Sequence, residues 1–233
     1  MHTTPLISHK SMRSAYLVLT FAMAASIQPA AAEDTLSRLQ KSAAVLDKLT
    51  DSTRHGIRPD QIGNADCVAV IPGFKKGAVG VGVSFGRGFI VCRNGDNWSA
   101  PGAVTMEGGS LGVQIGGETI DIVILSLDKD RRSKLLSDRF TIGSDASAAW
   151  GNGKSAHGDP NSKILFFAQT KGAFAGFDLD GVTLKPDDSG DKALYGKPMK
   201  NSEIVESAST PPAAQPLVSK LASLVHSESS SGK

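Results

Sequence analysis

The stretch "GAVGVGVSFGRG", Gly77–Gly88, decides the fold because two kinds of residue alternate along it. Even positions from 78 to 88 are Ala, Gly, Gly, Ser, Gly and Gly, whereas odd positions from 79 to 91 are Val, Val, Val, Phe, Arg, Phe and Val. A period of two places successive side chains on opposite faces of a β-strand. The pattern therefore predicts a strand over 77–92 with one bare face and one bulky face.

The bare face has an energetic cost that some other contact has to offset. A glycine inside a strand costs about 0.5–1 kcal/mol relative to alanine. Glycine in a strand also marks a place where another backbone or a ligand approaches closely. We therefore expect a neighbouring element, tight coiling into a barrel, or a bound apolar ligand against this face.

The same stretch is rich enough in glycine to resemble a phosphate-binding loop, but its spacing is wrong. Phe85 stands where the third glycine of Gly-x-Gly-x-x-Gly would be, and no Gly-Lys-Ser/Thr ends the run. A helix N-terminus should also follow, whereas the next residues are the strand-like "FIVCRNG". Nucleotide binding is therefore disfavoured.

Gly-x-Ser-x-Gly occurs twice, in "GVSFG" around Ser84 and in "GGSLG" around Ser110. The nucleophile elbow of an esterase needs a strand, a sharp turn and then a helix. Neither match is followed by helical sequence. A serine hydrolase that uses Ser84 or Ser110 is therefore a remote alternative, and we expect no enzyme.

Strand-like sequence dominates from Cys67 onward. We expect strands over 67–71, 77–92, 101–106, 109–117, 119–127, 139–149, 163–170 and 172–184, with a short charged helix over 128–138. The predicted fold class is α+β and mainly β: a compact, largely antiparallel, glycine-rich sheet or barrel. An N-terminal amphipathic helix and short helices would pack on it.

The N-terminal helix is predicted over 34–51. Apolar residues recur there at helical spacing, at Leu36, Leu39, Ala43, Leu46 and Leu49. The basic residues Arg38, Lys41 and Lys48 lie mostly off this stripe. The stripe either covers the core or meets a membrane interface.

The first 32 residues resemble a cleaved secretory signal. His9, Lys10 and Arg13 precede an apolar run, Ala15–Ile27, and small residues follow in an Ala-x-Ala pattern. A retained anchor is the alternative, although the run is short for a bilayer span. We expect an exported protein of a bacterial periplasm or cell envelope. The expected organisation is a signal over 1–32, a domain over 33–207 with its core at 67–198, and a linker and disordered tail over 208–233.

Charge argues against a nucleic-acid partner. Cleavage after residue 32 would remove Lys10 and Arg13, so the formal net charge falls from +2 to 0. A globally basic nucleic-acid binder is therefore disfavoured, and an anionic partner has to be met by a local patch.

Two further pairs of residues invite a structural role. Cys67 and Cys92 are the two cysteines of the chain, and in an oxidising compartment they form a disulfide candidate, with two buried thiols as the alternative. They supply too few ligands for a metal site, so neither metal nor cofactor is expected. Gln114 and Asp121 interrupt apolar strands, where they would form a buried polar pair or line a pocket.

Several stretches in order resemble one known family. They are "CVAVIPGFKKGAVGVGVSFGRGFIVCR", "WSAPGAVTMEGGSLGVQIGGETIDIVIL", "FTIGSDASAAWG", "TKGAFAGFDLDGVTLKPDD" and "ALYGKP", from Cys67 to Pro198. They are similar to the SYLF lipid-binding domain, also called the Ysc84 actin-binding-like domain, in its bacterial exported form. The family usually has a Gly-Pro-x-Gly-Arg turn after "DAS", whereas this chain has "GNGKSAHGDP".

The resemblance implies a non-enzymatic module that binds phospholipid, including phosphoinositides in eukaryotic members. It implies lipid contacts through the N-terminal helix, hence through Leu36, Leu39, Leu46 and Leu49, and through basic residues. From charge placement we add Lys75, Lys76, Arg87 and Arg93. The expected partner is an anionic phospholipid or membrane surface, and actin is an improbable partner in a bacterial envelope. The alternative is an envelope structural or protein-interaction module that binds no lipid.

Overall fold

The computed structural model describes residues 35–51, 56–143, 149–150, 163–170 and 181–231. The predicted signal peptide lies outside these ranges. In chain order the elements are α1 (Thr35–Thr50), α2 (Pro59–Gly63), β1 (Cys67–Asn94), β2 (Asn97–Trp98), β3 (Gly102–Ser126), η1 (Lys129–Arg131), α3 (Arg132–Leu135), β4 (Phe140–Thr141), β5 (Ala149–Trp150), β6 (Ile164–Thr170), β7 (Thr183–Pro186), α4 (Asp188–Tyr195), α5 (Asn201–Ser207), η2 (Pro212–Ala214) and α6 (Gln215–Ser231).

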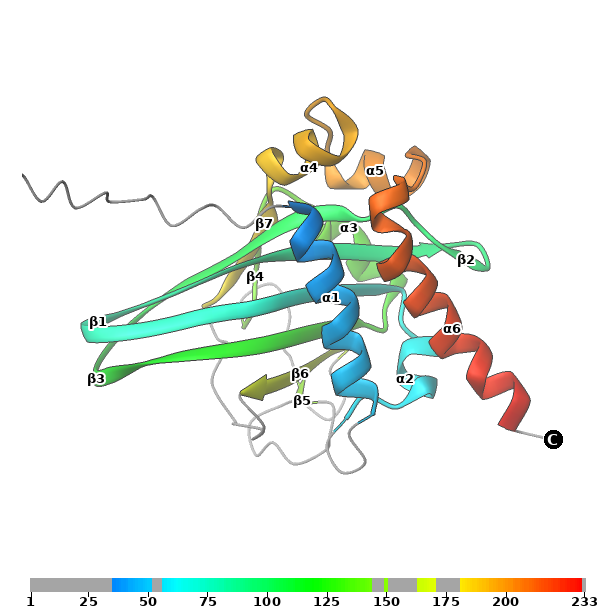
Figure 1. Cartoon of the computed structure of the whole chain (residues 1–233). Coiled ribbons are helices and arrows are strands. Elements are labelled where there is room, and N and C mark those ends of the chain that lie inside the picture. The colour runs from blue at the N-terminus through cyan, green and yellow to red at the C-terminus, as the bar shows by residue number, and fades with distance from the viewer. Residues whose placement is uncertain (1–34, 52–55, 144–148, 151–162, 171–180, 232–233) are drawn as a thin grey trace, which may run out of the picture. The chain divides into compact units, whose positions relative to one another are not determined.

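Strands β1 and β3 form a long antiparallel ribbon that folds back on itself. Their pairing runs from Cys67↔Ser126 to Ile90↔Gly102, with irregularities between Ile71 and Phe74 and between Val79 and Val81. A fully extended segment of 25 residues would span roughly 80 Å, yet the Cα atoms of Cys67 and Cys92, 25 positions apart, lie 3.9 Å apart. β1 therefore runs outward, bends near Val79–Val81 and returns, and Figure 1 shows both strands doing so.

The remaining strands extend this folded ribbon on both sides. β6 pairs antiparallel with residues 120–126 of β3, and β7 pairs antiparallel with residues 104–107. The short strands β2, β4 and β5 complete a 7-stranded sheet in which only β5 and β6 pair in parallel. The result is a curled, antiparallel half-barrel with helices on it (Figure 1), which confirms the predicted fold class.

The bare face of the opening stretch packs against the outgoing half of its own strand. A Cβ atom on Gly88 would lie 1.9 Å from the carbonyl oxygen of Val70, and one on Gly86 would lie 2.8 Å from Cγ2 of Ile71. No side chain larger than hydrogen fits at either position without moving the neighbouring strand. Close packing of one half of β1 against the other thus explains why Gly86 and Gly88 are glycines.

Side chains alternate between two hydrophobic cores. The inner core lies inside the half-barrel and includes Ile71, Phe74, Ile90, Met106, Ile122 and Phe166. The outer core lies between the ribbon and the helices α1, α2 and α6 and includes Leu39, Leu46, Val68, Phe89, Leu217 and Leu221. Figure 1 shows α1 and α6 lying across the same side of the sheet. These helices cover the base of the ribbon, where the two ends of β1 meet.

Some predicted elements differ from those in the structure. The segment expected to be a linker and disordered tail contains α6, because Leu217 and Leu221 are both 0% exposed against the outer core. Of the predicted strand over 139–149, only Phe140–Thr141 and the first residue of β5 are paired within the described residues. Most of the predicted strand over 172–184 lies outside the described residues.

Candidate functional site

Two large apolar side chains project from the returning half of β1 into solvent. Val83 is 66% exposed and Phe85 is 47% exposed. They lie on the bulky face of the strand, the same face as Phe89 and Val91, which are 0% exposed. The two pairs differ in exposure because of their position along the strand. Phe89 and Val91 lie in the outer core with residues of α1 and α6. An exposed pair of this kind is typical of a surface that meets a partner.

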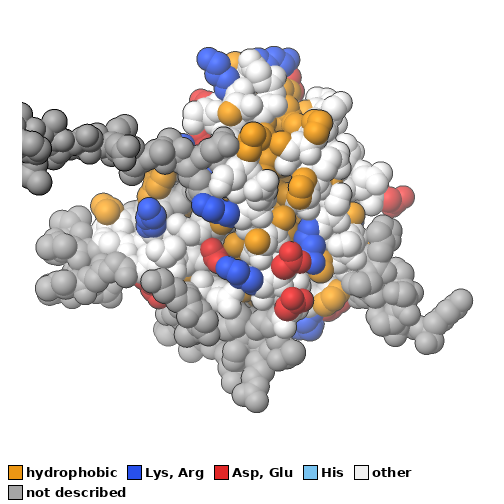
Figure 2. Space-filling model, viewed as in Figure 1, with side chains coloured by type: hydrophobic (Ala, Val, Ile, Leu, Met, Phe, Trp, Pro, Cys, Tyr) orange, Lys and Arg blue, Asp and Glu red, His pale blue; other side chains and the backbone are white. Residues whose placement is uncertain are grey.

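A shallow groove joins this apolar pair to basic residues. It has a volume of about 380 Å³ and is lined by Lys75, Lys76, Gly77, Val83, Phe85, Glu118 and Thr119. Glu118 lies opposite Lys76 in the β1–β3 ladder. The groove therefore places two ammonium groups and one carboxylate around an apolar wall. In Figure 2, Lys or Arg side chains border hydrophobic ones over the ribbon at the left of the molecule.

Arg87 lies between the exposed Phe85 and the buried Asp187 and contacts both. Its guanidinium carbon lies 5.8 Å from the centroid of the Phe85 ring, within the range of a cation–π contact. Its Nε lies 3.6 Å from Oδ2 of Asp187, and its side chain is 36% exposed. We call Lys75, Lys76, Val83, Phe85 and Arg87 together the ribbon patch.

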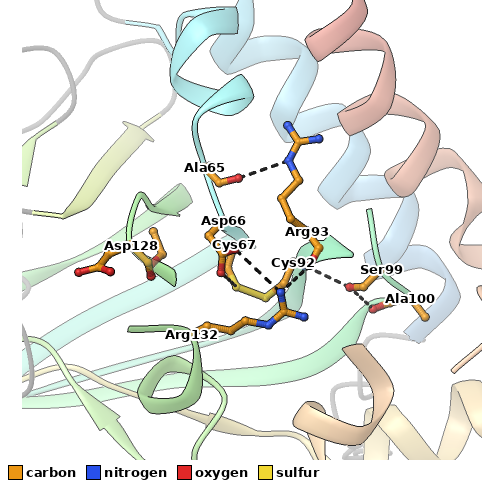
Figure 3. Close-up of a disulfide and its surroundings, with 10 residues drawn as sticks. Ala65, Asp66, Cys67, Cys92, Arg93, Ser99, Ala100, Asp128 and Arg132 are labelled. Carbon is orange, nitrogen blue, oxygen red and sulfur yellow. Dashed lines mark hydrogen bonds and ion pairs between the residues drawn. A yellow bond between two sulfur atoms is a disulfide. The ribbon is translucent and has the colours of Figure 1, made fainter. Parts of the chain in front are cut away.

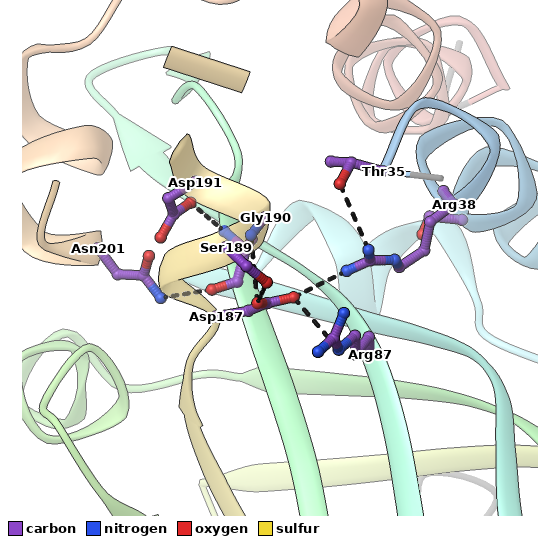
Figure 4. Close-up of polar contacts among 10 residues, drawn as sticks. Thr35, Arg38, Arg87, Asp187, Ser189, Gly190, Asp191 and Asn201 are labelled. Carbon is purple, nitrogen blue, oxygen red and sulfur yellow. Dashed lines mark hydrogen bonds and ion pairs between the residues drawn. The ribbon is translucent and has the colours of Figure 1, made fainter. Parts of the chain in front are cut away.

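Asp187 is shared between Arg87 and a second, buried arginine. Nη1 of Arg38 donates to Oδ2 of Asp187 at 3.0 Å, and the two side chains are 1% and 4% exposed. Figure 4 shows both guanidinium groups directed toward the carboxylate. Burial opposes ionisation of Asp187, but hydrogen bonds from Ser189 and Gly190 and the two arginines outweigh it, so the pKa of Asp187 lies below its ordinary value. The two guanidinium groups of Arg38 and Arg87 thus share the Asp187 carboxylate.

A second buried carboxyl lies next to this pair. Asp191 is 0% exposed, and its Oδ1 accepts from the backbone nitrogen of Ala103 at 2.7 Å. Asn201 donates to the carbonyl of the same Ala103 at 3.1 Å. Burial raises the pKa of Asp191 to about 7, against the Ala103 hydrogen bond and with a further rise from the nearby Asp187 and Asp188 carboxylates. Asp191 and Asn201 thus attach α4 and α5 to the start of β3 (Figure 4).

Of the predicted leucines on the N-terminal helix, only Leu36 is exposed, at 47%. Leu39, Leu46 and Leu49 are 0% exposed and belong to the outer core. Arg38, expected off the apolar stripe, is instead buried with Asp187. The apolar face of α1 therefore covers the sheet, and a membrane contact through those three leucines would require α1 to leave it.

Arg93 has a structural position. Its guanidinium lies 4.1 Å over the Trp98 ring, and Nη2 donates to the carbonyl of Gly63 at 3.1 Å. Nε donates to the carbonyl of Ala65 at 3.4 Å (Figure 3). These carbonyls lie at the C-terminal end of α2 and just beyond it, where backbone oxygens lack helical partners. Arg93 is thus engaged by the protein itself, whereas among the described residues Lys75 and Lys76 form no ion pair within 4.0 Å.

The two predicted pairs have different outcomes. The structure contains the disulfide between Cys67 and Cys92, which joins the two ends of β1 (Figure 3). Asp121 is partly buried, accepts from the backbone nitrogen of Gly73 at 2.9 Å and lies 3.6 Å from Nζ of Lys48. The Gln114 side chain lies outside the described residues. Asp121 therefore holds the irregularity of β1 at Gly73 in place.

The two serines lie within the ribbon. Oγ of Ser84 donates to the carbonyl of Gly108 at 3.1 Å, and Ser110 pairs with Gly82 in the ladder. Both continue in strand, so neither forms a nucleophile elbow. Among the described residues, no three His, Cys, Asp or Glu side chains are grouped as metal ligands. Within the same residues, no helix has the length and apolar character to cross a membrane.

Comparison with known proteins places the chain in a family. A family model described as Ysc84, "Las17-binding protein actin regulator", matches residues 107–224. The chain is 30% identical to Protein YSC84 of Saccharomyces cerevisiae over 204 residues, which is 78% of this chain and 42% of the relative. It is 30% identical to the SH3 domain-containing YSC84-like protein 1 of Xenopus laevis over 173 residues, 69% of this chain and 51% of the relative.

A third relative is LAS seventeen-binding protein 3 of Saccharomyces cerevisiae, 30% identical over 168 residues, 68% of this chain and 36% of the relative. No solved structure matches the chain. The half-barrel with its covering helices therefore belongs to a protein of the Ysc84, or SYLF, family. The chain spans about half or less of the length of these three relatives, namely 42%, 51% and 36%.

Proposed function

We propose that this protein is a non-enzymatic module that binds the surface of anionic phospholipid membranes, and that it does so in a bacterial cell envelope after export. The observation that carries the proposal is the ribbon patch. Val83 and Phe85 are exposed beside Lys75, Lys76 and Arg87. Exposed apolar side chains bordered by cations match the chemistry of a membrane surface, which is apolar below a layer of phosphates.

Estimates of the binding free energy support an anionic membrane as the partner. Each basic residue near an anionic membrane surface contributes about 1 kcal/mol, so three contribute about 3 kcal/mol. Burial of apolar area adds roughly 25 cal/mol per Å². Arg87 shares the Asp187 carboxylate with Arg38 and is itself 36% exposed, so its guanidinium is accessible to a lipid phosphate. Together these contributions give a weak, reversible, salt-sensitive attachment.

The alternative is a protein-interaction module without lipid binding. The matching family model is described as a Las17-binding actin regulator, and those words refer to a protein partner. The ribbon patch favours lipid because its cations surround an apolar wall at one end of an extended ribbon.

Vesicle co-sedimentation separates these functions. We expect the protein to sediment with phosphatidylglycerol vesicles, less with phosphatidylcholine vesicles, and less in both when salt rises. Lys75→Glu with Lys76→Glu should weaken binding to anionic vesicles at least tenfold. Lys134→Glu with Lys192→Glu, exposed lysines on α3 and α4, makes the same charge change elsewhere and is the control. A folded protein that sediments with neither vesicle, and instead with filamentous actin, would favour the alternative.

A further inference from the structure

The bent end of the ribbon is uncharged on both strands. Residues 77–86 and residues 108–117 contain no Asp, Glu, Lys or Arg. Charged residues border both stretches at nearly the same level of the ladder, since Lys76 pairs with Glu118 and Phe85 pairs with Glu107. The uncharged stretches of the two strands therefore lie side by side, and together they form one end of the ribbon.

The sequence at the bend is also apolar. The irregularity of pairing lies between Val79, opposite Ile115, and Val81, opposite Leu111. Val83 and Phe85 follow on the returning half, on the face that carries Phe89 and Val91, and they are exposed because the helices do not extend over them. Exposed apolar side chains such as Val83 and Phe85 beside an uncharged stretch of chain are typical of a surface that meets a partner.

The dimensions of this end match the outer part of a bilayer. From the level of Lys76 to the bend is about four residues, and each strand residue advances about 3.3 Å, so the uncharged end projects roughly 13 Å. Elements that lie in a membrane interface bury their apolar faces roughly 5–10 Å below the headgroups. The end is therefore long enough to reach the acyl chains while its charged border stays at the level of the phosphates.

The backbone limits how deep this end can enter a membrane. Unpaired N–H and C=O groups are costly in hydrocarbon. β1 and β3 pair with each other along the uncharged end, from Gly77↔Gly117 through Val79↔Ile115 and from Val81↔Leu111 through Ser84↔Gly108. In an antiparallel pair every second residue turns its backbone groups toward the partner strand, so the others face the free edges of the ribbon. These edge groups need water or lipid headgroups as partners, which keeps the bent end within the membrane interface.

We propose that the bent end of the β1–β3 ribbon inserts into the membrane as a wedge. In this arrangement Val83 and Phe85 contact the acyl chains close to the glycerol, just below the lipid phosphates, and Lys75, Lys76 and Arg87 lie at the phosphates. This inference rests on the proposed function and adds to it the inserting element and its depth. In this proposal the ribbon contacts the acyl chains. The apolar face of α1 does not, because it stays packed on the sheet.

Depth-dependent fluorescence quenching tests the insertion. Phe85→Trp places a reporter on the ribbon, and Leu36→Trp places one at a matched exposure, because both side chains are 47% exposed. Each is mixed with phosphatidylglycerol vesicles that contain lipids brominated on the acyl chain near the glycerol, and wild type supplies the background of Trp98 and Trp150. We expect at least twofold quenching of the reporter at position 85 and none above background at position 36.

Polar, uncharged substitutions provide an independent measurement. Val83→Ser with Phe85→Ser keeps the charge and removes the apolar contact, so binding to anionic vesicles should fall at least tenfold. Leu36→Ser is the matched control and should change binding less than twofold. All of these side chains are exposed, so melting temperatures close to that of wild type are expected and confirm folding.

The outcomes separate the two proposals. If wild type sediments with the vesicles but position 85 is not quenched and the serine variant binds normally, the wedge is wrong and peripheral headgroup binding stands. If position 36 is quenched instead, α1 is the inserting element and the wedge is also wrong. If wild type binds no vesicle, both the wedge and the proposed function fail.

Discussion

Arg38 on α1 and Asp187, the N-cap of α4, form a buried ion pair across 149 positions of the sequence, with Nη1 and Oδ2 3.0 Å apart. The pair fastens the N-terminal helix to the C-terminal part of the sheet. Oδ2 of Asp187 also lies 3.6 Å from Nε of Arg87. The same carboxylate therefore contacts both α1, through Arg38, and the ribbon patch, through Arg87.

Removal of one partner of this pair should be strongly destabilising. We expect Asp187→Ala to lower the free energy of unfolding by about 3–5 kcal/mol, because it leaves the buried Arg38 guanidinium without its carboxylate. Asp187→Ala also removes the cap that accepts from Gly190, worth about 1 kcal/mol. Urea unfolding measures the effect, and Asp188→Ala, an exposed neighbour, is the control. Equal stability of the two variants would contradict the role given to the pair.

The raised pKa of Asp191 predicts a pH dependence of stability. Its pKa is about 7 in the folded protein and about 3.9 in an unfolded chain. The unfolded state therefore releases the proton first, and stability is greatest below about pH 4 and falls as pH rises to 7, by on the order of 3 kcal/mol. Asp187 acts in the opposite direction at low pH, since its depressed pKa means that its contribution is lost as pH falls below about 4. Measurements between pH 5 and pH 8 separate the effect of Asp191 from that of Asp187, and comparison with a variant at position 191 separates it from that of the histidines.

Asp191→Asn should remove this dependence. The amide oxygen can still accept from the nitrogen of Ala103, and an uncharged amide avoids the cost of a buried carboxylate at high pH. We therefore expect the variant to be more stable than wild type at pH 8 by urea unfolding, with a nearly flat profile from pH 5 to pH 8. Parallel profiles for the two proteins would show that Asp191 does not titrate in this range.

Glycines of the opening stretch should differ sharply in their tolerance of alanine. Gly88→Ala places a methyl group 1.9 Å from the carbonyl oxygen of Val70, so the two halves of β1 have to separate, at a cost of about 3 kcal/mol or more. Gly77→Ala meets nothing within 4 Å and should be neutral or stabilise by about 0.5–1 kcal/mol. Melting temperatures of the two variants compare them directly, and similar values would disprove the packing of the bare face.

The disulfide should stabilise the folded ribbon. It closes a segment of 25 residues, for which the loss of loop entropy in the unfolded chain corresponds to about 3 kcal/mol. Cys67→Ala with Cys92→Ala should therefore unfold at lower urea concentration than wild type. Addition of dithiothreitol should lower the midpoint of wild type and leave that of the variant unchanged. A reductant effect on both proteins would point to another cause.

Much of the fold was predictable because strand periodicity is a local property. The alternation of small and bulky residues over 77–92 predicted the strand and its bare face, and the glycines predicted a close neighbour. The identity of that neighbour was not predictable, because Val70 and Ile71 approach only when β1 folds back. The helical spacing of Leu217 and Leu221 was visible in the sequence, yet their role in the core depends on the position of α6 against α1 and α2.

Some residues of the candidate site were likewise predictable from the sequence, and others were not. Lys75, Lys76 and Arg87 were candidates from their charge, and the structure leaves them on one patch, whereas Arg93 is engaged at α2. Val83 and Phe85 were not identified as surface residues. They share the periodicity of Phe89 and Val91, and only the extent of the covering helices distinguishes the two pairs.

The sequence by itself determined the strand period, the bare and bulky faces, the cysteine pair and the uncharged character of residues 77–86 and 108–117. These properties depend on neighbours a few positions apart. The tertiary structure decided which cations of the described residues are held by other segments, as Arg93 is, and which apolar residues are exposed. It also decided that Arg38 is buried with Asp187, because burial and ion pairing depend on contacts between segments far apart in the chain.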